Sequence, residues 1–494
     1  MLLSELLDVL PEKKVCGYRD VDIESLFYDS RLVVPGSAFF CIKGLNTDGH
    51  LYAKEAISKG AVALFCEKEP DFENTHAVKV FVPDTREAMA LCSDAFFRHP
   101  SRKMKIVGVT GTNGKTTTTF LIENICRYAG IKTGLIGTVE LHIGEEKEPV
   151  VRTTPESLDL QKTLRRMADH GVQVVAMEVS SHALALKRVN GVEFNFVVFT
   201  NLTQDHLDFH ITIEDYFAAK KGLFLIDQFG SERVAIVNCD DEFGLKIIEE
   251  TKLPVRTFGI EREADVRAKN VEVLPGGNRF LLEVGDLKSH IKTQLVGRFN
   301  VYNCLAAAAC SVEMGIGMDS IENGLANLSG IPGRFEKIDC GQDFSVFVDY
   351  AHTPDGIMNL LEACREVTDG RVIIVVGCGG DRDRSKRPLM GRVAVGLSDL
   401  CIITSDNPRS EDPHEIIEMI LDGVRSEFPS ERYIVEVDRK DAIYKAISLA
   451  RKGDVVAIAG KGHESGQIFA DRIIPFDDRV VAREALKEVK GAKC

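Results

Sequence analysis

A glycine-rich run that follows an apolar strand is the part of this chain best suited to chemistry. Residues 105–119 read Lys-Ile-Val-Gly-Val-Thr-Gly-Thr-Asn-Gly-Lys-Thr-Thr-Thr-Thr, and an amphipathic helical pattern comes next. Gly111 and Gly114 would let backbone N–H groups point at phosphate oxygens, and the start of the helix adds its positive dipole end. Lys115 would then reach the β- and γ-phosphates, and the Thr116 hydroxyl would hold Mg²⁺. The run predicts a site for ATP or a close relative.

The run departs from the strict phosphate-loop pattern at one position. That pattern has a glycine five residues before Gly114, where this chain has Val109. The alternative is a glycine-rich turn that binds nothing. The preceding strand, the intact Gly-Lys-Thr and the helix that follows favour the phosphate site.

Further polar segments follow predicted strands, which is where ligands bind in open α/β sheets. Glu178 ends the strand pattern at 173–177, and a carboxylate at such an edge suits a hard Mg²⁺ ion. The other segments are Thr-Asn-Leu-Thr-Gln-Asp-His-Leu-Asp-Phe-His at 200–210, Tyr-Phe-Ala-Ala-Lys at 216–220, Asp-Tyr-Ala-His-Thr-Pro-Asp at 349–355, Gly-Cys-Gly-Gly-Asp-Arg-Asp at 377–383, Asp-Asn-Pro-Arg at 406–409 and Gly-Lys-Gly-His-Glu at 460–464.

The elements that would position these segments alternate between strands and helices. This alternation predicts an α/β protein with mostly parallel sheets and crossover helices. A length of 494 residues suggests about three domains. A basic segment at 98–103 and a turn at 330–333 are the candidate boundaries. We predict an α/β domain at 1–100, a central phosphate-loop domain at 101–332 and a Rossmann-like, doubly wound domain at 333–494. Strands are expected at the start of the 105–119 run and at 38–42, 61–65, 173–177, 196–199, 233–237, 371–377 and 454–459, a strand-rich piece at 255–295, and helices at 53–59 and 301–310.

Composition limits the classes of partner. The formal charge of −14 makes non-specific binding to nucleic acid or to an anionic membrane unfavourable. No apolar stretch approaches the ~20 residues needed to cross a bilayer. The N-terminus carries acidic residues where a secretory signal needs basic ones, and the thirteen cysteines include no C-x-x-C pair. We expect a cytoplasmic enzyme that neither binds nucleic acid nor inserts into a membrane.

In this order along the chain, the segments resemble the signatures of the Mur ligase family, the ATP-dependent amide-forming enzymes of bacterial cell-wall precursor assembly. Within that family the chain is similar to the MurE type, which adds the third amino acid of the peptide stem. The first domain contributes Tyr28-Asp-Ser-Arg31, Pro35-Gly36 and Asp48-Gly-His50. The resemblance spans nearly the whole chain, and it depends on the order of the motifs rather than on any one of them.

The resemblance implies a ligase reaction in two steps. A carboxylate of UDP-N-acetylmuramoyl-L-Ala-D-Glu attacks the γ-phosphate of ATP to give an acyl phosphate, and the amine of the incoming amino acid then displaces phosphate. ATP and Mg²⁺ are the implied cofactors, and we expect a monomer. The first domain would bind the UDP end of the substrate.

The resemblance also implies roles for individual residues. Catalytic roles fall to Lys115, Glu178, His206 and Lys220, with Lys220 carbamylated so that it becomes an anion. Metal binding falls to Thr116, Glu178, His206 and Lys220. ATP would be bound by Gly111, Thr112, Asn113, Gly114, Lys115, Thr116, Thr117, Asn303, Arg334 and Asp349. The UDP substrate would be bound by Ser30, Thr153, Thr154, Ser180 and Arg188. The amino acid would be bound by Arg382, Asp406, Asn407, Pro408, Arg409, Gly460 and Glu464.

The motif around Arg409 bears on the choice of amino acid. Two acceptors dominate in the family, meso-diaminopimelate and L-lysine, which differ by a carboxylate at the far end. Asp-Asn-Pro-Arg matches the diaminopimelate type, because a guanidinium can grip a carboxylate with two parallel hydrogen bonds. Lysine would leave Arg409 unpaired in its pocket at a cost in free energy. We therefore expect meso-diaminopimelate as the acceptor.

Other interpretations stay open at this point. His206 and His210 have the spacing of a zinc-binding helix, but Leu207 stands where a metalloprotease has its catalytic glutamate. Gly377–Gly380 could be part of a dinucleotide fingerprint, Asp406–Arg409 an ordinary turn, and Lys220 a surface lysine. Rival functions are a lysine-adding ligase, a folylpolyglutamate synthase and an ATPase that drives a conformational switch. The last of these leaves the segments at 406–409 and 460–464 without a role.

Overall fold

The computed structural model describes residues 1–494 except 45–46, 70–75, 151, 226–232 and 492–494. Its contacts divide the chain into two compact units. The first unit comprises Met1–Thr110, Ile131–Val197 and Ala219–Val234, and the second comprises Gly111–Gly130, Val198–Ala218 and Ala235–Cys494.

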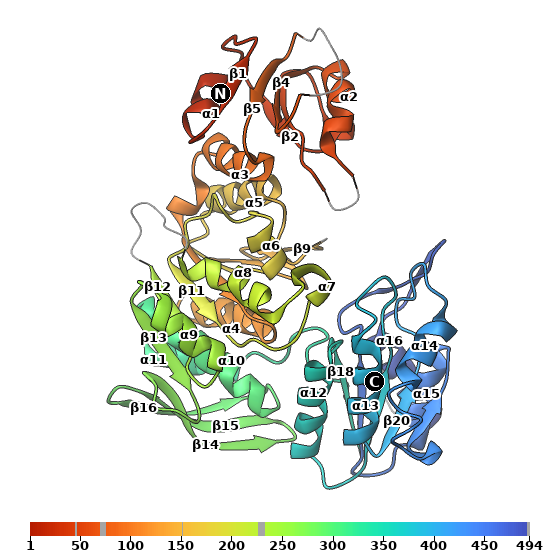
Figure 1. The fold of residues 1–494 in the computed structure, drawn as a ribbon. Coiled ribbons are helices and arrows are strands. Elements are labelled where there is room, and N and C mark those ends of the chain that lie inside the picture. The colour runs from red at the N-terminus through yellow and green to blue at the C-terminus, as the bar shows by residue number, and fades with distance from the viewer. Residues whose placement is uncertain (45–46, 70–75, 151, 226–232, 492–494) are drawn as a thin grey trace. The chain divides into compact units, whose positions relative to one another are not determined.

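The first unit contains a five-stranded sheet near the N-terminus (Figure 1). Its strands run in the order β1-β5-β4-β3-β2, and all neighbours pair in parallel except β1 with β5. Leu3, Leu6, Phe40 and Phe65 share one core cluster of this sheet. The strands are β1 (Lys14–Cys16), β2 (Ser25–Phe27), β3 (Ser37–Phe40), β4 (Ala61–Cys66) and β5 (Val78–Phe81), with helices α1 (Leu3–Asp8), α2 (Ala53–Ser58) and α3 (Thr85–Phe96).

The rest of the first unit is built on β6 (Lys105–Thr110) and β10 (Val174–Glu178). These strands pair in parallel, and β10 also pairs in parallel with β7. Every residue of β10 is buried, as expected for a strand covered on both faces. The remaining elements are β7 (Thr133–Ile136), β8 (Leu141–Ile143), β9 (Glu146–Glu148), α5 (Ser157–Asp169) and α6 (Ser181–Ala185), while β11 (Phe196–Phe199) and α8 (Ile213–Leu225) straddle the division between the units.

The second unit begins with α4 (Lys115–Tyr128), the helix predicted to follow the glycine-rich run. It packs against α10 (Arg298–Glu313) and α11 (Met318–Ala326). Gly324 permits this contact, because a Cβ there would lie 2.5 Å from the Cα of Ile125. The other elements of this part are α7 (Leu207–His210), β12 (Val234–Asn238), α9 (Glu242–Glu250), β13 (Val255–Gly259), β14 (Val266–Leu274), β15 (Gly277–Val284) and β16 (Leu287–Thr293).

A six-stranded sheet carries the remainder of the second unit, in the order β17-β18-β22-β19-β20-β21 (Figure 1). The five strands from β18 to β21 pair in parallel. Alternate residues of β19 enter two separate cores, Ile374 with α12, α13 and α14, and Ile373 with α15 and α16. The strands are β17 (Glu336–Lys337), β18 (Ser345–Asp349), β19 (Val372–Val376), β20 (Leu400–Ile403), β21 (Tyr433–Val435) and β22 (Val455–Ala459). The helices are α12 (Pro354–Glu366), α13 (Lys386–Leu397), α14 (Pro413–Leu421), α15 (Arg439–Leu449) and α16 (Asp478–Lys490), and a hairpin pairs β23 (Gly466–Ile468) with β24 (Ile473–Pro475).

The expected α/β class is confirmed, since parallel strands alternate with helices and the six-stranded sheet is covered on both faces. Each predicted strand and helix is present within three residues of its expected bounds, and the strand-rich piece corresponds to β13–β16. The basic segment expected as a linker contains a short 3₁₀ helix over Pro100–Lys103. Among the described residues, no helix combines the length and apolar character that spanning a membrane requires.

Candidate active site

The glycine-rich run forms a loop between β6 and α4, and two of its glycines have a steric reason. Gly111 has φ 147°, and a Cβ there would lie 1.9 Å from Oγ1 of Thr200. Gly114 has φ 84°, and a Cβ there would lie 2.2 Å from Oδ1 of Asn303. A side chain at either position would therefore push the loop away from its neighbours. The strict phosphate-loop pattern has its first glycine at 109, whereas this chain has it at 111, where the turn has a positive φ.

The first residues of the predicted segment at 200–210 brace this loop within the second unit. The amide of Asn113 donates to Oδ1 of Asn201 at 2.9 Å, and Oγ1 of Thr200 donates to the Asn113 carbonyl at 2.6 Å. The amide of Thr203 donates to Oγ1 of Thr112 at 3.0 Å. The predicted loop residues Thr112 and Asn113 are thus held by hydrogen bonds that leave little freedom to the backbone.

Lys115 begins α4, and its ammonium lies over the loop. Nζ donates to the carbonyls of Gly111 at 2.9 Å and Thr112 at 2.8 Å. Thr116 is buried and its Oγ1 accepts from Nη2 of Arg334 at 3.1 Å, while Thr117 is buried in the same turn. A lysine, two hydroxyls and a helix N-terminus thus surround the loop, which is the chemistry that a polyphosphate needs.

Two residues distant in the sequence, Asn303 and Arg334, lie at this loop. Asn303 packs on Gly114 and accepts from Oγ1 of Thr118 at 3.5 Å. Arg334 reaches Thr116 and stacks on the ring of Tyr350, with 4.8 Å from its guanidinium carbon to the ring centre.

Asp349 holds the turn that presents Arg334. Its carboxylate accepts from the amides of Phe335 at 2.6 Å and Ala351 at 2.7 Å. Burial raises the pKa of Asp349, although the neighbouring Arg334 and the two amides oppose that rise. Its position beside the arginine agrees with the predicted set, while its role toward a nucleotide stays a prediction.

His206 is the N-cap residue of α7 and has φ 55°. Its Nε2 lies 3.4 Å from Oδ2 of Asp205. Burial opposes ionisation of Asp205, but His206, His352 and Lys386 outweigh it and lower the pKa of that carboxyl. No group of three or more His, Cys, Asp and Glu side chains close enough to hold a metal occurs among the described residues, so the zinc interpretation of His206 and His210 gains no support.

Glu178 and Lys220 belong to the first unit. Oε1 of Glu178 accepts from the Thr138 amide at 2.8 Å, and Oε2 accepts from Thr138 Oγ1 at 3.1 Å. Lys220 lies in α8 and is only 1% exposed, so it is no surface lysine. A lysine this deeply buried must be paired or must lose its positive charge.

Four of the residues predicted for the UDP substrate lie together at the end of β10. Oγ1 of Thr154 donates to the Glu178 carbonyl at 2.8 Å and accepts from the Ser180 amide at 3.1 Å. Nη1 of Arg188 donates to the Thr154 carbonyl at 3.2 Å. Thr153 joins through its hydroxyl, which accepts from Thr138 Oγ1 at 3.1 Å.

Ser30 belongs to the five-stranded part of the first unit. Its hydroxyl donates to Oε2 of Glu55 at 2.8 Å, and its carbonyl accepts from Nζ of Lys59 at 3.1 Å. No hydrogen bond among the described residues joins Ser30 to the cluster around Thr154.

The residues predicted for the amino acid gather at the carboxyl edge of the six-stranded sheet. Nδ2 of Asn407 donates to Oε2 of Glu464 at 2.7 Å, and Gly460 has φ 116°, with Oδ2 of Asp406 2.6 Å from where its Cβ would be. Arg409 has φ 53°, and its Nη1 donates to the Gly380 carbonyl at 2.7 Å. Pro408 lies between these residues, and its carbonyl oxygen is 1.9 Å from where a Gly380 Cβ would be.

Arg409 is half-buried beside Arg382. Burial lowers the pKa of the Arg409 guanidinium, and repulsion from Arg382 lowers it further, whereas Asp406 and Glu464 oppose the shift. Cations and anions therefore interact around Arg409. Such a cluster suits a ligand that carries a carboxylate and an ammonium group.

The glycines at 377–380 serve close packing rather than a dinucleotide. A Cβ on Gly377 would lie 2.5 Å from the carbonyl oxygen of Thr404, and one on Gly379 would lie 2.9 Å from Nη1 of Arg409. The turn after β19 thus seats the segment that carries Arg409.

Sequence reasoning missed several side chains around these sites. Lys461 is fully buried, and its Nζ donates to Oδ1 of Asn407 at 2.8 Å and to Oε2 of Glu464 at 3.0 Å. The sequence offered one indication of Lys461, since it lies between Gly460 and Gly462 in the motif at 460–464. Thr200, Asn201 and Asp355 had the same kind of signal, whereas the burial of Arg387 and Glu411 had none.

Glu411 braces the turn beside Arg409 and should make the protein sensitive to acid. It accepts two hydrogen bonds of 2.9 Å from Arg387, which is fully buried, while Glu411 is 7% exposed. The hydrogen bonds from Arg387 lower the pKa of Glu411 to about 2, although burial opposes the shift. Because this pKa is below the unfolded value of about 4.3, the stabilisation is present above that value and is lost as pH falls toward 2.

Glu411→Gln should lower the free energy of unfolding at pH 7 by about 3 kcal/mol, because a buried arginine loses its charged partner. It should also flatten the decline in stability between about pH 4.3 and the folded pKa of about 2. Urea unfolding at several pH values measures both effects. Glu418→Gln, which breaks an exposed pair with Arg425, is the control and should cost below about 1 kcal/mol. Equal costs for the two variants would contradict the structural role of Glu411.

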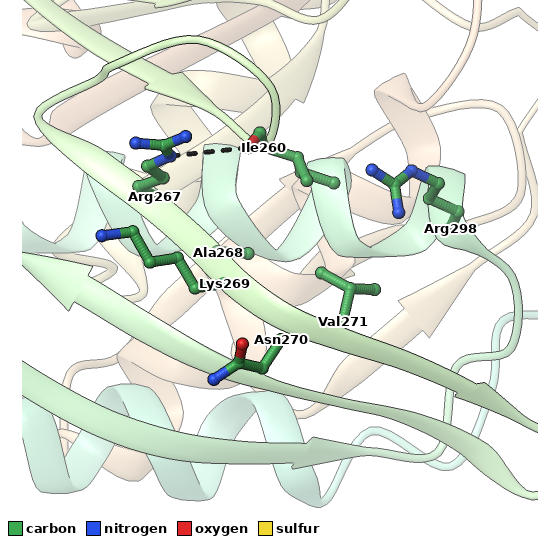
Figure 2. Close-up of a pocket in the computed structure, with 7 residues that line it drawn as sticks. All are labelled: Ile260, Arg267, Ala268, Lys269, Asn270, Val271 and Arg298. Atoms are coloured by element: carbon green, nitrogen blue, oxygen red, sulfur yellow. Dashed lines mark hydrogen bonds between the residues drawn. The ribbon is translucent and has the colours of Figure 1, made fainter.

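A surface cavity of about 330 Å³ lies apart from these residues, against β14 and the start of α10 (Figure 2). The described residues that line it include none of those predicted for a site. Its three cations already have acidic partners, since Arg267 pairs with Glu263, Lys269 with Glu283 and Arg298 with Glu261. We assign no ligand to it.

Models of one family match three successive parts of the chain. The Mur ligase family, catalytic domain, matches residues 22–97; the Mur ligase middle domain matches residues 109–311; and the Mur ligase, glutamate ligase domain, matches residues 333–462.

Curated relatives and solved structures agree with these matches. The UDP-N-acetylmuramoyl-L-alanyl-D-glutamate--2,6-diaminopimelate ligase of Syntrophomonas wolfei is 47% identical over 487 residues and covers 99% of both chains. The protein of the same name from Geobacillus thermodenitrificans is 49% identical over 492 residues, which is 99% of this chain and 100% of that one. A solved structure of a ligase with this name is 32% identical, with a TM-score of 0.66 over 94% of this chain and 95% of the other. MurF from Acinetobacter baumannii, at 18% identity and a TM-score of 0.69 over 98% of each chain, shares the fold. The chain therefore belongs to the Mur ligase family.

Proposed function

We propose that this chain is an ATP-dependent, ADP-forming ligase that joins meso-diaminopimelate to UDP-N-acetylmuramoyl-L-Ala-D-Glu in peptidoglycan precursor synthesis. The names of the relatives and the family membership support this reaction. We further propose that it acts as a cytoplasmic monomer with a UDP-binding domain at 1–100, an ATP-binding domain at 101–332 and an amino-acid-binding domain at 333–494.

The mixed charge of the acceptor pocket is the observation that carries the choice of amino acid. Diaminopimelate has a distal carboxylate and a distal ammonium, whereas lysine has only the ammonium. Arg409 and Arg382 repel each other, and a carboxylate between them would relieve that repulsion. Asp406 and Glu464 supply carboxylate oxygens that would accept from the ammonium. Asn407 would act beside them by holding Glu464, to which its Nδ2 donates at 2.7 Å, since its own Oδ1 accepts from Lys461 at 2.8 Å.

The phosphate loop supports the first chemical step. Two anions must meet there, a substrate carboxylate and the γ-phosphate, so cations and N–H donors have to offset their repulsion. We assign Lys115 to the β- and γ-phosphates, with the N–H groups at the N-terminus of α4 beside them. Asn303 would contact the adenine, and Arg334, positioned by Asp349, would reach the nucleotide. The substrate's acyl phosphate then reacts with the acceptor amine, and phosphate leaves as the amide forms.

The donor set fits Mg²⁺ better than a transition metal. Mg²⁺ prefers hydroxyl and carboxylate oxygens and usually completes its shell with water and substrate phosphates. Thr116 and Glu178 offer such oxygens, and we assign metal binding to these two residues, to His206 and to a carbamylated Lys220. When bound, the ions would neutralise charge that develops on the phosphates. Lys220 is only 1% exposed, so carbamylation would exchange a buried cation for a buried anion, whose charge a bound Mg²⁺ would offset.

The cluster at the end of β10 supports a binding site for the muramoyl peptide. Thr153, Thr154, Ser180 and Arg188 supply hydroxyl, amide and guanidinium groups within one hydrogen-bonded set. We assign Ser30 to the uridine end of the substrate.

The test is phosphate release from ATP with the UDP-muramoyl dipeptide and either meso-diaminopimelate or L-lysine. Turnover with diaminopimelate and little with lysine is the expected result, because lysine leaves the arginines unpaired; such polar mismatches give about 10⁴-fold discrimination. Comparable turnover with lysine would contradict the acceptor assignment and keep the ligase. ATP hydrolysis that needs no acceptor would instead support the rival ATPase.

A further inference from the structure

Asp355 joins three segments of the second unit at one carboxylate oxygen. Its Oδ2 accepts from Nδ2 of Asn113 at 2.7 Å, from Oγ1 of Thr203 at 3.0 Å and from Nδ2 of Asn359 at 3.0 Å. Asn113 lies 242 residues away in the phosphate loop, and Thr203 lies 152 residues away in the segment that leads to His206. Only Asn359 belongs to the same helix as Asp355.

We propose that Asp355 is a positioning residue that keeps the phosphate loop in register with the amino-acid-binding pocket. This inference rests on the proposed ligase function. Asp355 makes no chemical step itself, since Asn113, Thr203 and Asn359 are protein donors rather than reacting groups. It acts through Asn113 on the loop and through Thr203 on the segment before His206.

The backbone around Asn113 shows why its side chain matters. Its amide and carbonyl already bond to Asn201 and Thr200. The side chain is therefore the part of this residue that extends toward α12, and it ends on Asp355. Movement of α12 would pull on the loop through this bond.

Burial raises the pKa of Asp355, and the hydrogen bonds from Thr203, Asn113 and Asn359 oppose that rise because they favour the ionised carboxylate. A carboxylate beside a phosphate-binding loop repels the nucleotide, so a neutral residue would serve packing better. Hydrogen bonds to an ionised acceptor are about twice as strong as neutral ones. Asp355 also lies in the first turn of α12, after the N-cap Thr353, where the helix dipole favours a negative charge. The carboxylate of Asp355 repels the nucleotide, but it makes stronger hydrogen bonds to Asn113 and Thr203 than a neutral side chain would.

The same junction is linked to the acceptor pocket by the fold. Asp355 follows β18, and β18 pairs with β22, whose end leads to Gly460 and Lys461. A second bond runs in parallel, from Arg334 to Thr116 at 3.1 Å. These two contacts tie the loop to the sheet that carries Asp406 and Arg409. A displacement of about 1 Å between reacting groups can cost about 10²-fold in rate.

Asp355→Asn, Thr203→Val and the double variant test this role. We expect Asp355→Asn to lower kcat with diaminopimelate by about 10²-fold, while the Kd for ATP and the melting temperature stay near those of the wild type. The double variant should be no worse than Asp355→Asn, because both changes break one junction. Glu415→Gln is the matched control, a first-turn carboxylate of α14, and should leave kcat unchanged.

Amide hydrogen exchange in the same variants separates this inference from the proposed function. Asp355→Asn should speed exchange in 111–114 and 200–206, and Glu415→Gln should not; this readout needs no turnover. Absence of wild-type ligase activity would reject the proposed function, while faster exchange would still support the junction. Unchanged exchange with kcat within about threefold of the wild type would overturn the inference. Losses of kcat that add up in the double variant would also overturn the inference, and so would losses of kcat that follow the fraction of folded protein.

Discussion

Replacing Lys115 with alanine is expected to lower kcat for acceptor-dependent phosphate release by about 10³-fold. The ammonium of Lys115 lies over the phosphate loop, 2.9 Å from the Gly111 carbonyl and 2.8 Å from the Thr112 carbonyl. Because charge moves onto the β,γ-bridge as the γ-phosphate transfers, loss of this cation costs more in the transition state than in the ground state. Steady-state kinetics together with the Kd for ATP would show a larger loss in kcat than in affinity.

Arg127→Ala is the control for this variant, since Arg127 lies in the last turn of the same helix and is exposed. It should change kcat by less than about twofold, as expected for a surface substitution. If Lys115→Ala kept wild-type kcat, Lys115 would have no part in phosphoryl transfer and the phosphate-site assignment would fail.

Replacing Arg409 with alanine is expected to lower kcat/KM for meso-diaminopimelate by about 10³-fold while the KM for ATP changes little. The guanidinium is half-buried and one arm is fixed on the Gly380 carbonyl. Its loss would leave the distal carboxylate of the acceptor without its bidentate partner. Selectivity against lysine should fall as well, because the feature that penalises lysine is removed.

Two further variants sharpen this result. Arg409→Lys keeps a charge but loses the planar fork, so it should recover only part of the activity. Gly379→Ala would place a Cβ 2.9 Å from Nη1 of Arg409 and should shift the guanidinium, with an intermediate loss. Arg392→Ala is the control: Arg392 lies on α13, and its loss breaks only an exposed ion pair with Glu427. Equal losses in diaminopimelate and ATP parameters for Arg409→Ala would contradict its assignment to the acceptor.

The local patterns of the chain were sufficient for much of the architecture. Buried strands such as Val372–Val376 and Val455–Ala459 read as continuous apolar runs that end in polar or glycine residues, which is typical of parallel strands covered on both faces. The phosphate loop was predictable because its glycines, lysine and threonine are consecutive. Family membership followed from the order of motifs, and the comparisons confirmed it. The roles assigned to the site residues remain predictions.

Tertiary structure decided what local patterns could not. Lys220 and Lys461 look like ordinary helix and loop lysines in the sequence, yet both are buried, because burial depends on which elements pack above them. Asp355 meets Asn113 across 242 residues, and Glu411 closes on Arg387 across 24. Hydrophobic periodicity and glycine placement act over a few residues, so they predict elements. Strand order and helix packing bring distant side chains together, so only the folded chain shows which carboxylate or lysine belongs to a site.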